Sequence, residues 1–392
     1  MFHSQYAPRR AGRDDIAPAA WSPDVVASAS AHAARAEEDR RLAPETVRLL
    51  TEAGFPRYFA PRALGGTEGT FTDLVTAVAG VADADASAAW CAALWAAHSR
   101  FAAYLPPQGQ HDLWSAGPDV RIAAAVTPSG GAEPVPGGWT LGGEWECLSG
   151  VDFADWALLA ARDPRADGPA VRLHAVPRSD FTVRDSWHST GLRATGSNTV
   201  VVNAAFVPDH RSFLMADLMN GVSGPGRARC HTVPAQLVGG IVFAASALGA
   251  ARHALEVWSR WAAARLRADH AASGRDTLAL HRTLARSAGD VEAAGLLLRS
   301  AALRADLDGV TERTVASNRR DAAAATNLLV KAVERLFRTG GVHARSGEGE
   351  LQRCWRDVHT IAAHGVLDPE AAANAYAEAV LTEPKESSLV TT

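Results

Sequence analysis

Two histidines lie close together near the C-terminal end of the chain, in the stretch RCWRDVHTIAAHGVLD (353–368). On a continuous helix, which turns by roughly 100° per residue, His359 and His364 would point about 140° away from each other. Two metal ligands on one helix face need a spacing of three or four residues, so no metal site is predicted. We expect one of these histidines to take part in chemistry and the other, His359, to pack or to make a surface contact.

Two further residues have side chains suited to proton transfer or hydrogen bonding. They are His98, in the apolar stretch SAAWCAALWAAHSRFAAYL (87–105), and Ser149, in WECLSG (145–150). An imidazole titrates near neutral pH, and a hydroxyl both donates and accepts hydrogen bonds. Each has a plain alternative, because a lone histidine in an apolar helix is commonly a core residue and Ser-Gly favours a turn. Their place in the fold must decide between the two interpretations.

Composition excludes several classes of protein. The chain has 392 residues and a formal net charge of -4, with charges of both signs spread along it and no long basic run, so nucleic acid is not an expected partner. The four cysteines are far apart without a CxxC pair, which is typical of a reduced cytosolic protein. The N-terminal residues lack the apolar core of a signal peptide, and the longest apolar run (237–251) is too short to cross a bilayer. We therefore expect a soluble cytoplasmic protein that does not bind membranes.

The elements that must position these residues change in type along the chain. Residues 20–118 are predicted to form an N-terminal helical domain, in which Pro44 and Gly54 start and stop one helix. Residues 87–105 form another helix, apolar on nearly every side and therefore buried. From 119 to 230, short runs rich in Val, Leu, Trp and Thr alternate with Gly, Pro and Asp, which predicts a central antiparallel β-domain, a barrel or a sandwich.

Residues 231–385 are predicted to form a C-terminal four-helix bundle. Apolar residues recur at helical spacing, and the pattern is interrupted at 268–277 and again at Gly340 and Gly341. Asp368-Pro369 is typical of the cap and first position of a short additional helix. The fold class is therefore α+β, mainly α, and the two ends (1–20 and 383–392) are expected to be disordered.

This order of elements resembles the acyl-CoA dehydrogenase fold, and within it the oxygenase branch of two-component flavin-dependent monooxygenases, the group D hydroxylase-like family. Four segments carry the resemblance, which covers residues 25–380: SAAWCAALWAAH (87–98), WECLSGVDFADW (145–156), WHSTGLRATGSNTVVV (187–202) and LQRCWRDVHTIAAH (351–364). Any one segment alone is a weak signal. Their common order and spacing make the resemblance specific.

The resemblance argues against the dehydrogenase reaction itself. In the dehydrogenases a glutamate that follows an Arg-Asp pair in the last helices removes the α-proton of the substrate. Here Arg356-Asp357 is followed by His364 and Gly365 at the place of that carboxylate. Without this base, α,β-dehydrogenation lacks its first step.

The oxygenase branch implies roles for three residues in a C4a-hydroperoxyflavin mechanism. Ser149 matches the hydroxyl that holds the proton on flavin N5. His364 matches a histidine near C4a that supplies or steers a proton, a role suited to an ordinary imidazole pKa of about 6.5. His98 matches a base beside the hydroxyl or amine of the substrate.

The same resemblance implies a set of flavin contacts. Thr127 and the backbone from Cys147 to Ser149 would border the isoalloxazine ring. Trp187 and Ser197 would lie on a strand pair along the ring and the ribityl phosphate. The residues alone leave open that Trp187 is a core residue and Ser197 a turn residue.

The resemblance also implies partners. Gly340 and Gly341, which are otherwise only a helix stop, would approach the flavin phosphate of a neighbouring subunit in a homotetramer. The sequence has no GxGxxG fingerprint and no P-loop, so a site for NAD(P)H is not evident. Reduced FMN or FAD would therefore come from a separate NAD(P)H-flavin reductase, with O2 as co-substrate.

The function implied is hydroxylation of a small natural-product substrate of aromatic or polyketide type. Three alternatives stay open. One is N-oxygenation of an amino sugar on the same fold. Another is an acyl-CoA dehydrogenase whose base lies elsewhere in the bundle, for which Glu256 is the candidate. The last is a flavin-free, non-redox enzyme or binding protein.

Overall fold

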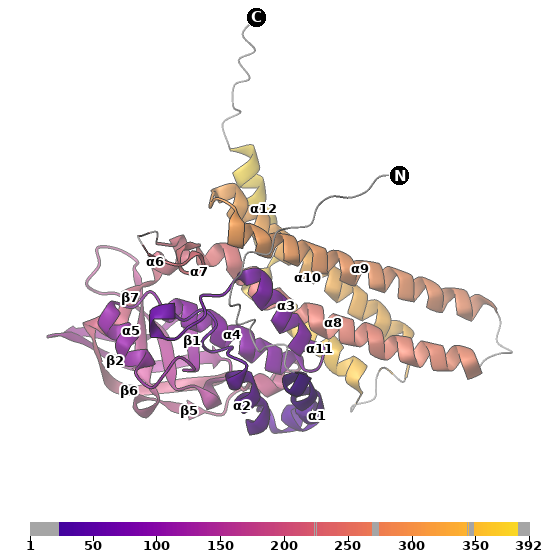
Figure 1. The fold of residues 1–392 in the computed structure, drawn as a ribbon, viewed down its shortest axis with the longest axis horizontal. Helices are drawn as coiled ribbons and strands as arrows, with labels where there is room; N and C mark the ends of the chain where they lie inside the picture. The colour runs from indigo at the N-terminus through magenta and orange to yellow at the C-terminus, as the bar shows by residue number, and fades with distance from the viewer. Residues whose placement is uncertain are drawn as a thin grey trace, which may run out of the picture.

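The computed structural model describes residues 23–382, except 223, 225, 269–273, 343 and 345–348. Helices come first, a sheet follows, and long helices end the chain (Figure 1), which confirms the predicted α+β, mainly α class. The sheet lies at one end of the molecule, and the longest helices extend away from it toward the other end (Figure 1). The predicted disordered ends lie outside the described residues.

Local sequence signals set the limits of the N-terminal helices. Pro44 opens its helix as predicted. The carboxylate of Asp85 caps the helix that begins at Ala86 by accepting from the backbone N–H groups of Ser87 and Ala88. The helices are α1 (Pro23–Asp39), α2 (Pro44–Glu52), α3 (Phe71–Ala82), α4 (Ala86–Ala102) and α5 (Pro107–Trp114).

Helix α4 is buried along nearly its whole length, as its apolar sequence predicts. It packs against α3 and α8, and it also contacts β1. It therefore carries Trp90 and His98 to the junction between the helices and the sheet.

Among the residues that the structure describes, seven strands form one sheet in the order β5-β6-β2-β1-β3-β4-β7. The prediction of a wholly antiparallel domain is wrong at one place, because β1 and β3 run parallel. After the β1–β2 hairpin, residues 149–155 cross the start of β1, so that Trp156 pairs with Ile122. The strands are β1 (Ile122–Val135), β2 (Gly138–Leu148), β3 (Trp156–Arg162), β4 (Val171–Pro177), β5 (Thr182–Arg184), β6 (Asn198–Pro208) and β7 (Ser212–Leu214).

The bundle begins after two short helices that follow the sheet. Its third long helix ends at Thr339, directly before the predicted stop at Gly340 and Gly341, and Asp368 caps the last helix with Pro369 at its first position. The helices are α6 (Met215–Asn220), α7 (Arg229–Thr232), α8 (Ala235–Ala268), α9 (Gly274–Leu307), α10 (Glu312–Thr339), α11 (Glu350–Ala362) and α12 (Pro369–Leu381).

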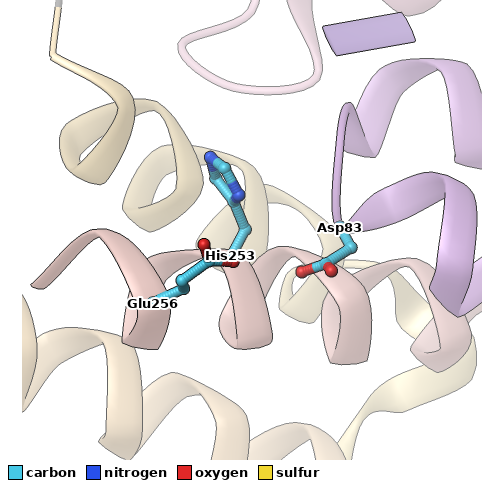
Figure 2. A group of neighbouring side chains, drawn as sticks. All are labelled: Asp83, His253 and Glu256. Carbon is cyan, nitrogen blue, oxygen red and sulfur yellow. The ribbon is translucent and has the colours of Figure 1, made fainter. Parts of the chain in front are cut away.

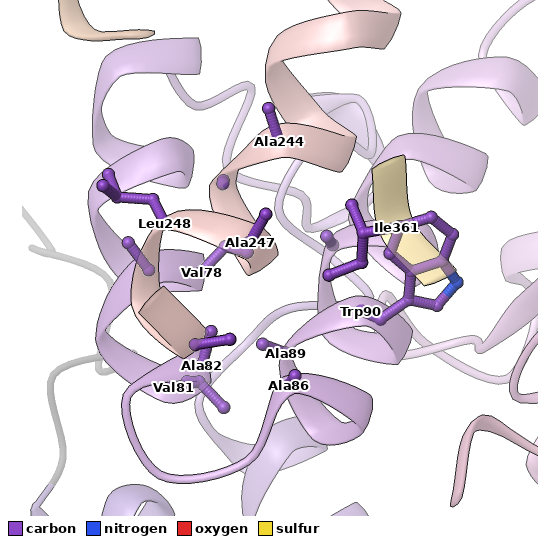
Figure 3. Close-up of a cluster of buried hydrophobic side chains, with 14 of the residues drawn as sticks. Val78, Val81, Ala82, Ala86, Ala89, Trp90, Ala244, Ala247, Leu248 and Ile361 are labelled. Atoms are coloured by element: carbon purple, nitrogen blue, oxygen red, sulfur yellow. The ribbon is translucent and has the colours of Figure 1, made fainter. Parts of the chain in front are cut away.

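One hydrophobic core joins the N-terminal helices to the bundle. Figure 3 shows side chains of α3 and α4 packed against those of α8 and α11. The contact between α3 and α8 is close at Gly249, where an added Cβ would lie 2.2 Å from the carbonyl oxygen of Ala79. Helix α8 is long and apolar enough to span a membrane, yet 78% of its most apolar stretch is buried inside the protein. Its apolar character is therefore that of a core helix of the bundle.

Candidate functional site

Ser149 lies in the crossover that follows β2. Just before it, the register between β2 and β6 shifts between Trp145 and Leu148, and Cys147 adopts a left-handed backbone conformation with φ of 63°. Such bulges re-aim the side chains beside them. As a result Cys147 is exposed, whereas Ser149 turns inward and is only 6% exposed.

The Ser149 hydroxyl belongs to a continuous chain of buried hydrogen bonds. The indole Nε1–H of Trp90 donates to Ser149 Oγ at 3.0 Å. Ser149 Oγ lies 2.7 Å from Ser197 Oγ, which lies 2.7 Å from Thr195 Oγ1. Thr195 Oγ1 in turn donates to the carbonyl oxygen of Leu192 at 2.8 Å. Helix α4, the crossover and the segment before β6 therefore meet at one polar network.

His364 is not part of the same helix as His359, although their predicted angle assumed one continuous helix. Helix α11 ends at Ala362, and the side chain of His364 instead caps the short helix Gly365–Leu367. Its Nδ1 accepts the backbone N–H of Val366 at 3.3 Å. The predicted angle of about 140° between the two histidines therefore does not apply. Only His364 reaches the hydrogen-bond network of Ser149.

The ring of His364 packs among aromatic side chains. It stacks on Phe243 of α8 with ring centroids 4.1 Å apart, and its centroid lies 6.0 Å from that of Trp90. Burial lowers its pKa below the usual value of 6.5, so the ring is neutral at pH 7. Because Nδ1 accepts a hydrogen bond, the proton of the neutral ring lies on Nε2, which presents a donor.

His359 makes the surface contact that was expected of it. Its Nδ1 bonds to the carbonyl oxygen of Trp355 at 2.9 Å, and its ring packs on the Trp355 indole with centroids 4.5 Å apart. Its Nε2 lies 3.9 Å from a carboxylate oxygen of Glu334. These contacts hold His359 against α10.

His98 is buried on α4, with 5% of its surface exposed. Its Nδ1 donates to the carbonyl oxygen of Ile122 at 2.8 Å, so Nε2 of the neutral ring carries a lone pair. Burial lowers its pKa to about 4, and the bond to Ile122 opposes that shift only in part. A pKa this low keeps His98 unprotonated at pH 7, and it also makes Nε2 a weak base.

The structure brings two of the three predicted catalytic residues together. Trp90 contacts both Ser149, through its hydrogen bond, and His364, through its ring edge. His98 lies eight residues beyond Trp90 on the same helix, which corresponds to about 12 Å along the axis. It bonds to the first residue of β1, the strand whose start the Ser149 crossover passes.

The predicted flavin contacts fall into two groups. Thr127 on β1 and Cys147 on β2 are exposed. Trp187 and Ser197 do not lie on a strand pair as predicted, because both fall in the segment between β5 and β6. There the indole Nε1–H of Trp187 donates to the carbonyl oxygen of Leu192 at 2.9 Å, the same oxygen that ends the hydroxyl chain.

Asp357 of α11 anchors this segment. The backbone N–H of Leu192 donates to Asp357 Oδ1 at 2.6 Å, and the neighbouring Arg356 pairs with Glu37 of α1 and bonds to the carbonyl oxygen of Thr190. Burial raises the pKa of Asp357 to about 7. The Arg-Asp pair noted in the sequence therefore fixes the loop that carries Ser197.

The glycine pair after α10 has two different backbone conformations. Gly340 is right-handed, with φ of -71°, and buried, and an added Cβ would lie 2.7 Å from that of Ala344. Gly341 has φ of 59°, in the left-handed region that favours glycine, with nothing within 4 Å of an added Cβ. Close packing at Gly340 and the turn at Gly341 both require a residue without a side chain.

Glu256 cannot act at the network around His364. It lies 13 residues after Phe243 on α8, about 20 Å along the helix axis. There it groups with Asp83 and His253, whose ligand atoms lie within 4.8 Å of one another (Figure 2). Glu256 also pairs with Arg260 at 3.2 Å. Its contacts are those of a partly exposed ion-pair cluster between α3 and α8.

Reduced flavin fits the residues at this network. The Ser149 hydroxyl accepts from Trp90 and bonds to Ser197, which leaves one of its three hydrogen-bonding positions for N5 of an isoalloxazine. The indole Nε1–H of Trp95 is fully buried without a partner, and an added Cβ at Gly150 would lie 2.9 Å from it. The Trp95 N–H is therefore a second hydrogen-bonding group beside Ser149 that the protein itself does not satisfy.

The fold and the site define a flavoenzyme of acyl-CoA dehydrogenase type. Residues 241–369 match the family described as acyl-CoA dehydrogenase, C-terminal domain. The chain is 32% identical over 348 residues to the flavin-dependent monooxygenase oxygenase subunit HsaA of Rhodococcus jostii (strain RHA1), covering 86% of this chain and 91% of that one. It is also 32% identical over 373 residues to the oxygenase component of an FADH(2)-dependent resorcinol hydroxylase of Rhizobium sp. (strain MTP-10005), covering 90% and 91%.

A solved structure gives the same result. The crystal structure of 3-HSA hydroxylase from Rhodococcus sp. RHA1 superposes with a TM-score of 0.86 at 29% identity, covering 93% of this chain and 98% of that one. The chain belongs to the family of oxygenase subunits of flavin-dependent monooxygenases. It is therefore an oxidoreductase, and the predicted family is confirmed.

Sequence reasoning missed several residues of the site. Phe243 lay within an apolar run and carried no chemical signal, and the backbone of Leu192 carried none either. Thr195 was detectable in principle, because the segment TGS places two hydroxyls around a glycine with φ of 50°. That conformation turns Thr195 and Ser197 toward each other.

Proposed function

We propose that this chain is the oxygenase component of a two-component system that uses reduced flavin and O2 to hydroxylate a small aromatic substrate. One observation carries the proposal: Trp90 joins the Ser149 hydroxyl and the His364 ring, the two groups predicted to flank the reactive edge of the flavin. The relatives named above include a resorcinol hydroxylase, which favours hydroxylation of a phenol over N-oxygenation.

The bound flavin supplies two electrons and O2 supplies the oxygen atom that is transferred. With flavin bound, Ser149 would accept a hydrogen bond from N5–H and would so hold that proton in place. His364 offers Nε2–H as a donor in the same region, and it does so as a neutral ring, because burial lowers its pKa. His98 accepts the substrate hydroxyl at Nε2 and orients it, a role that a weak base can fill.

Several further assignments belong to this proposal. Thr127, Cys147 and the Trp187 segment border the flavin, which is FMN or FAD. Gly340 and Gly341 reach the flavin phosphate of a neighbouring subunit in a homotetramer. A separate NAD(P)H-flavin reductase delivers the reduced flavin, and the protein works in the cytoplasm. The domains are 20–118, 119–230 and 231–385.

Isotope labelling tests the reaction. The protein is mixed with a flavin reductase, NADH, FMN or FAD, and a panel of phenols under ¹⁸O2. One labelled oxygen atom in a hydroxylated product, absent when the reductase is omitted, is the expected result. Consumption of O2 with no labelled product from any phenol, and release of only hydrogen peroxide, would contradict aromatic hydroxylation.

The dehydrogenase alternative has its own measurement. Protein loaded with oxidised flavin is mixed anaerobically with an acyl-CoA, and the flavin absorbance near 450 nm is followed. A persistent spectrum is expected, because no carboxylate from Glu256 can reach the network of Ser149 and His364. Bleaching would show that a base is present after all.

A further inference from the structure

We infer that Thr195 and Ser197 fix the hydroxyl of Ser149 as a hydrogen-bond acceptor, and that this makes the site select reduced flavin over oxidised flavin. The inference rests on the proposed function, since it assumes that Ser149 faces flavin N5. It goes further by assigning the redox preference to two residues that lie behind Ser149.

The direction of each hydrogen bond follows from counting protons. A hydroxyl has one proton and two lone pairs. The carbonyl oxygen of Leu192 can only accept, so the single proton of Thr195 Oγ1 is committed to it. Thr195 Oγ1 must then accept from Ser197, whose proton is used in that bond. Ser197 Oγ must in turn accept from Ser149.

The same count shows which hydrogen-bonding positions of the Ser149 hydroxyl are used. Its proton is donated to Ser197, and one of its lone pairs accepts the indole N–H of Trp90. One lone pair is left, and no proton. All three hydroxyl-bearing residues are 6% exposed or less, so little water reaches them to reverse the order.

This polarity distinguishes the two redox states of a flavin. Reduced flavin carries a proton on N5 and donates it to the free lone pair of Ser149. Oxidised flavin has only a lone pair on N5, which would face the lone pair of Ser149 without a hydrogen bond. Losing one buried hydrogen bond in this way corresponds to roughly a 10-fold difference in affinity. An oxygenase component that must capture reduced flavin from solution and release the oxidised form benefits from this bias.

Two variants should weaken the selection. Thr195→Val removes the acceptor of the Ser197 proton, and Ser197→Ala removes the acceptor of the Ser149 proton. In both, Ser149 becomes free to donate to oxidised N5. The dissociation constants for reduced and oxidised flavin are measured by equilibrium dialysis, the former under argon. The ratio of the oxidised to the reduced constant should fall about 10-fold, equivalent to about 30 mV in the two-electron potential of the bound flavin.

A matched variant outside the site should retain the parent ratio. Thr326→Val makes the same change as Thr195→Val in the bundle, where the buried hydroxyl donates to the carbonyl oxygen of Ala322 at 2.9 Å. A general loss of packing would weaken both redox forms together and leave the ratio unchanged.

The outcomes separate the inference from the proposed function. Tight binding of flavin with an unchanged ratio in both Thr195→Val and Ser197→Ala refutes the inference and leaves the proposed function standing. An equal fall of the ratio in Thr326→Val also refutes it. Failure of the parent protein to bind either form of FMN or FAD refutes the proposed function itself.

Discussion

Asp357 gives the most direct test of how the bundle holds the site. Its side chain is 5% exposed, and Oδ1 accepts the backbone N–H of Leu192 at 2.6 Å. Burial is the main cause that raises its pKa from 3.8 to about 7. The hydrogen bond from Leu192 opposes the shift, the carboxylates of Asp85 and Glu37 add to it, and the guanidinium of Arg356 reduces it.

The sign of the effect on stability follows from proton linkage. Because the pKa of Asp357 is higher in the folded state, the folded protein binds more protons than the unfolded chain between pH 3.8 and about 7. The free energy of unfolding therefore decreases as pH rises through this window. At about 1.36 kcal/mol per pKa unit, Asp357 lowers the free energy of unfolding by about 2.5 kcal/mol between pH 5 and pH 8.

Asp357→Asn removes the ionisation of Asp357 and so isolates its contribution to the pH dependence of stability. The amide oxygen still accepts from Leu192, but the side chain no longer ionises. Urea unfolding of the parent and the variant is measured from pH 5 to pH 8. The stability of the variant relative to the parent should rise by about 2.5 kcal/mol across that range. The same substitution at solvent-exposed Asp167 is the control for removing a surface carboxylate. A difference between Asp357→Asn and the parent that is the same at pH 5 and pH 8 would refute the reasoning.

Three other substitutions test the site. Ser149→Ala should raise the fraction of NADH oxidation that ends as hydrogen peroxide, by roughly fivefold for the loss of one hydrogen bond, as measured by a peroxidase assay. His98→Phe should lower kcat/KM for the hydroxylated product at least 10-fold and leave peroxide release in the absence of substrate unchanged. Gly150→Ala should cost about 1 to 3 kcal/mol in urea unfolding, because φ is 68° and the new Cβ would meet the Trp95 indole, whereas Gly289→Ala, in open space on α9, should cost nothing.

The features that the sequence predicted well depend on neighbouring residues in the chain. The burial of α4 follows from its continuous apolar composition, and the start of α12 follows from Asp368 and Pro369. Both signals lie within a few residues of the structure they determine. The presence of strands between 119 and 230 was predicted for the same reason.

The features that the sequence did not predict depend on distant contacts. The parallel pairing of β1 with β3 requires a crossover, and β1 pairs antiparallel with β2 on its other side, so the sequence of β1 alone does not determine the direction of its partners. The helical position assumed for His364 was wrong, because α11 ends at Ala362. The bond between Trp90 and Ser149 joins residues 59 positions apart.

The two histidines of the proposed site show why residue type alone does not assign a role. Both rings are neutral at pH 7, since burial lowers both pKa values. At His98 a carbonyl oxygen faces Nδ1, so Nε2 is an acceptor; at His364 a backbone N–H faces Nδ1, so Nε2 is a donor. A base beside a substrate hydroxyl needs the first arrangement, and a proton donor near the flavin needs the second. The backbone group that each ring meets, which only the fold determines, therefore assigns the donor and the acceptor.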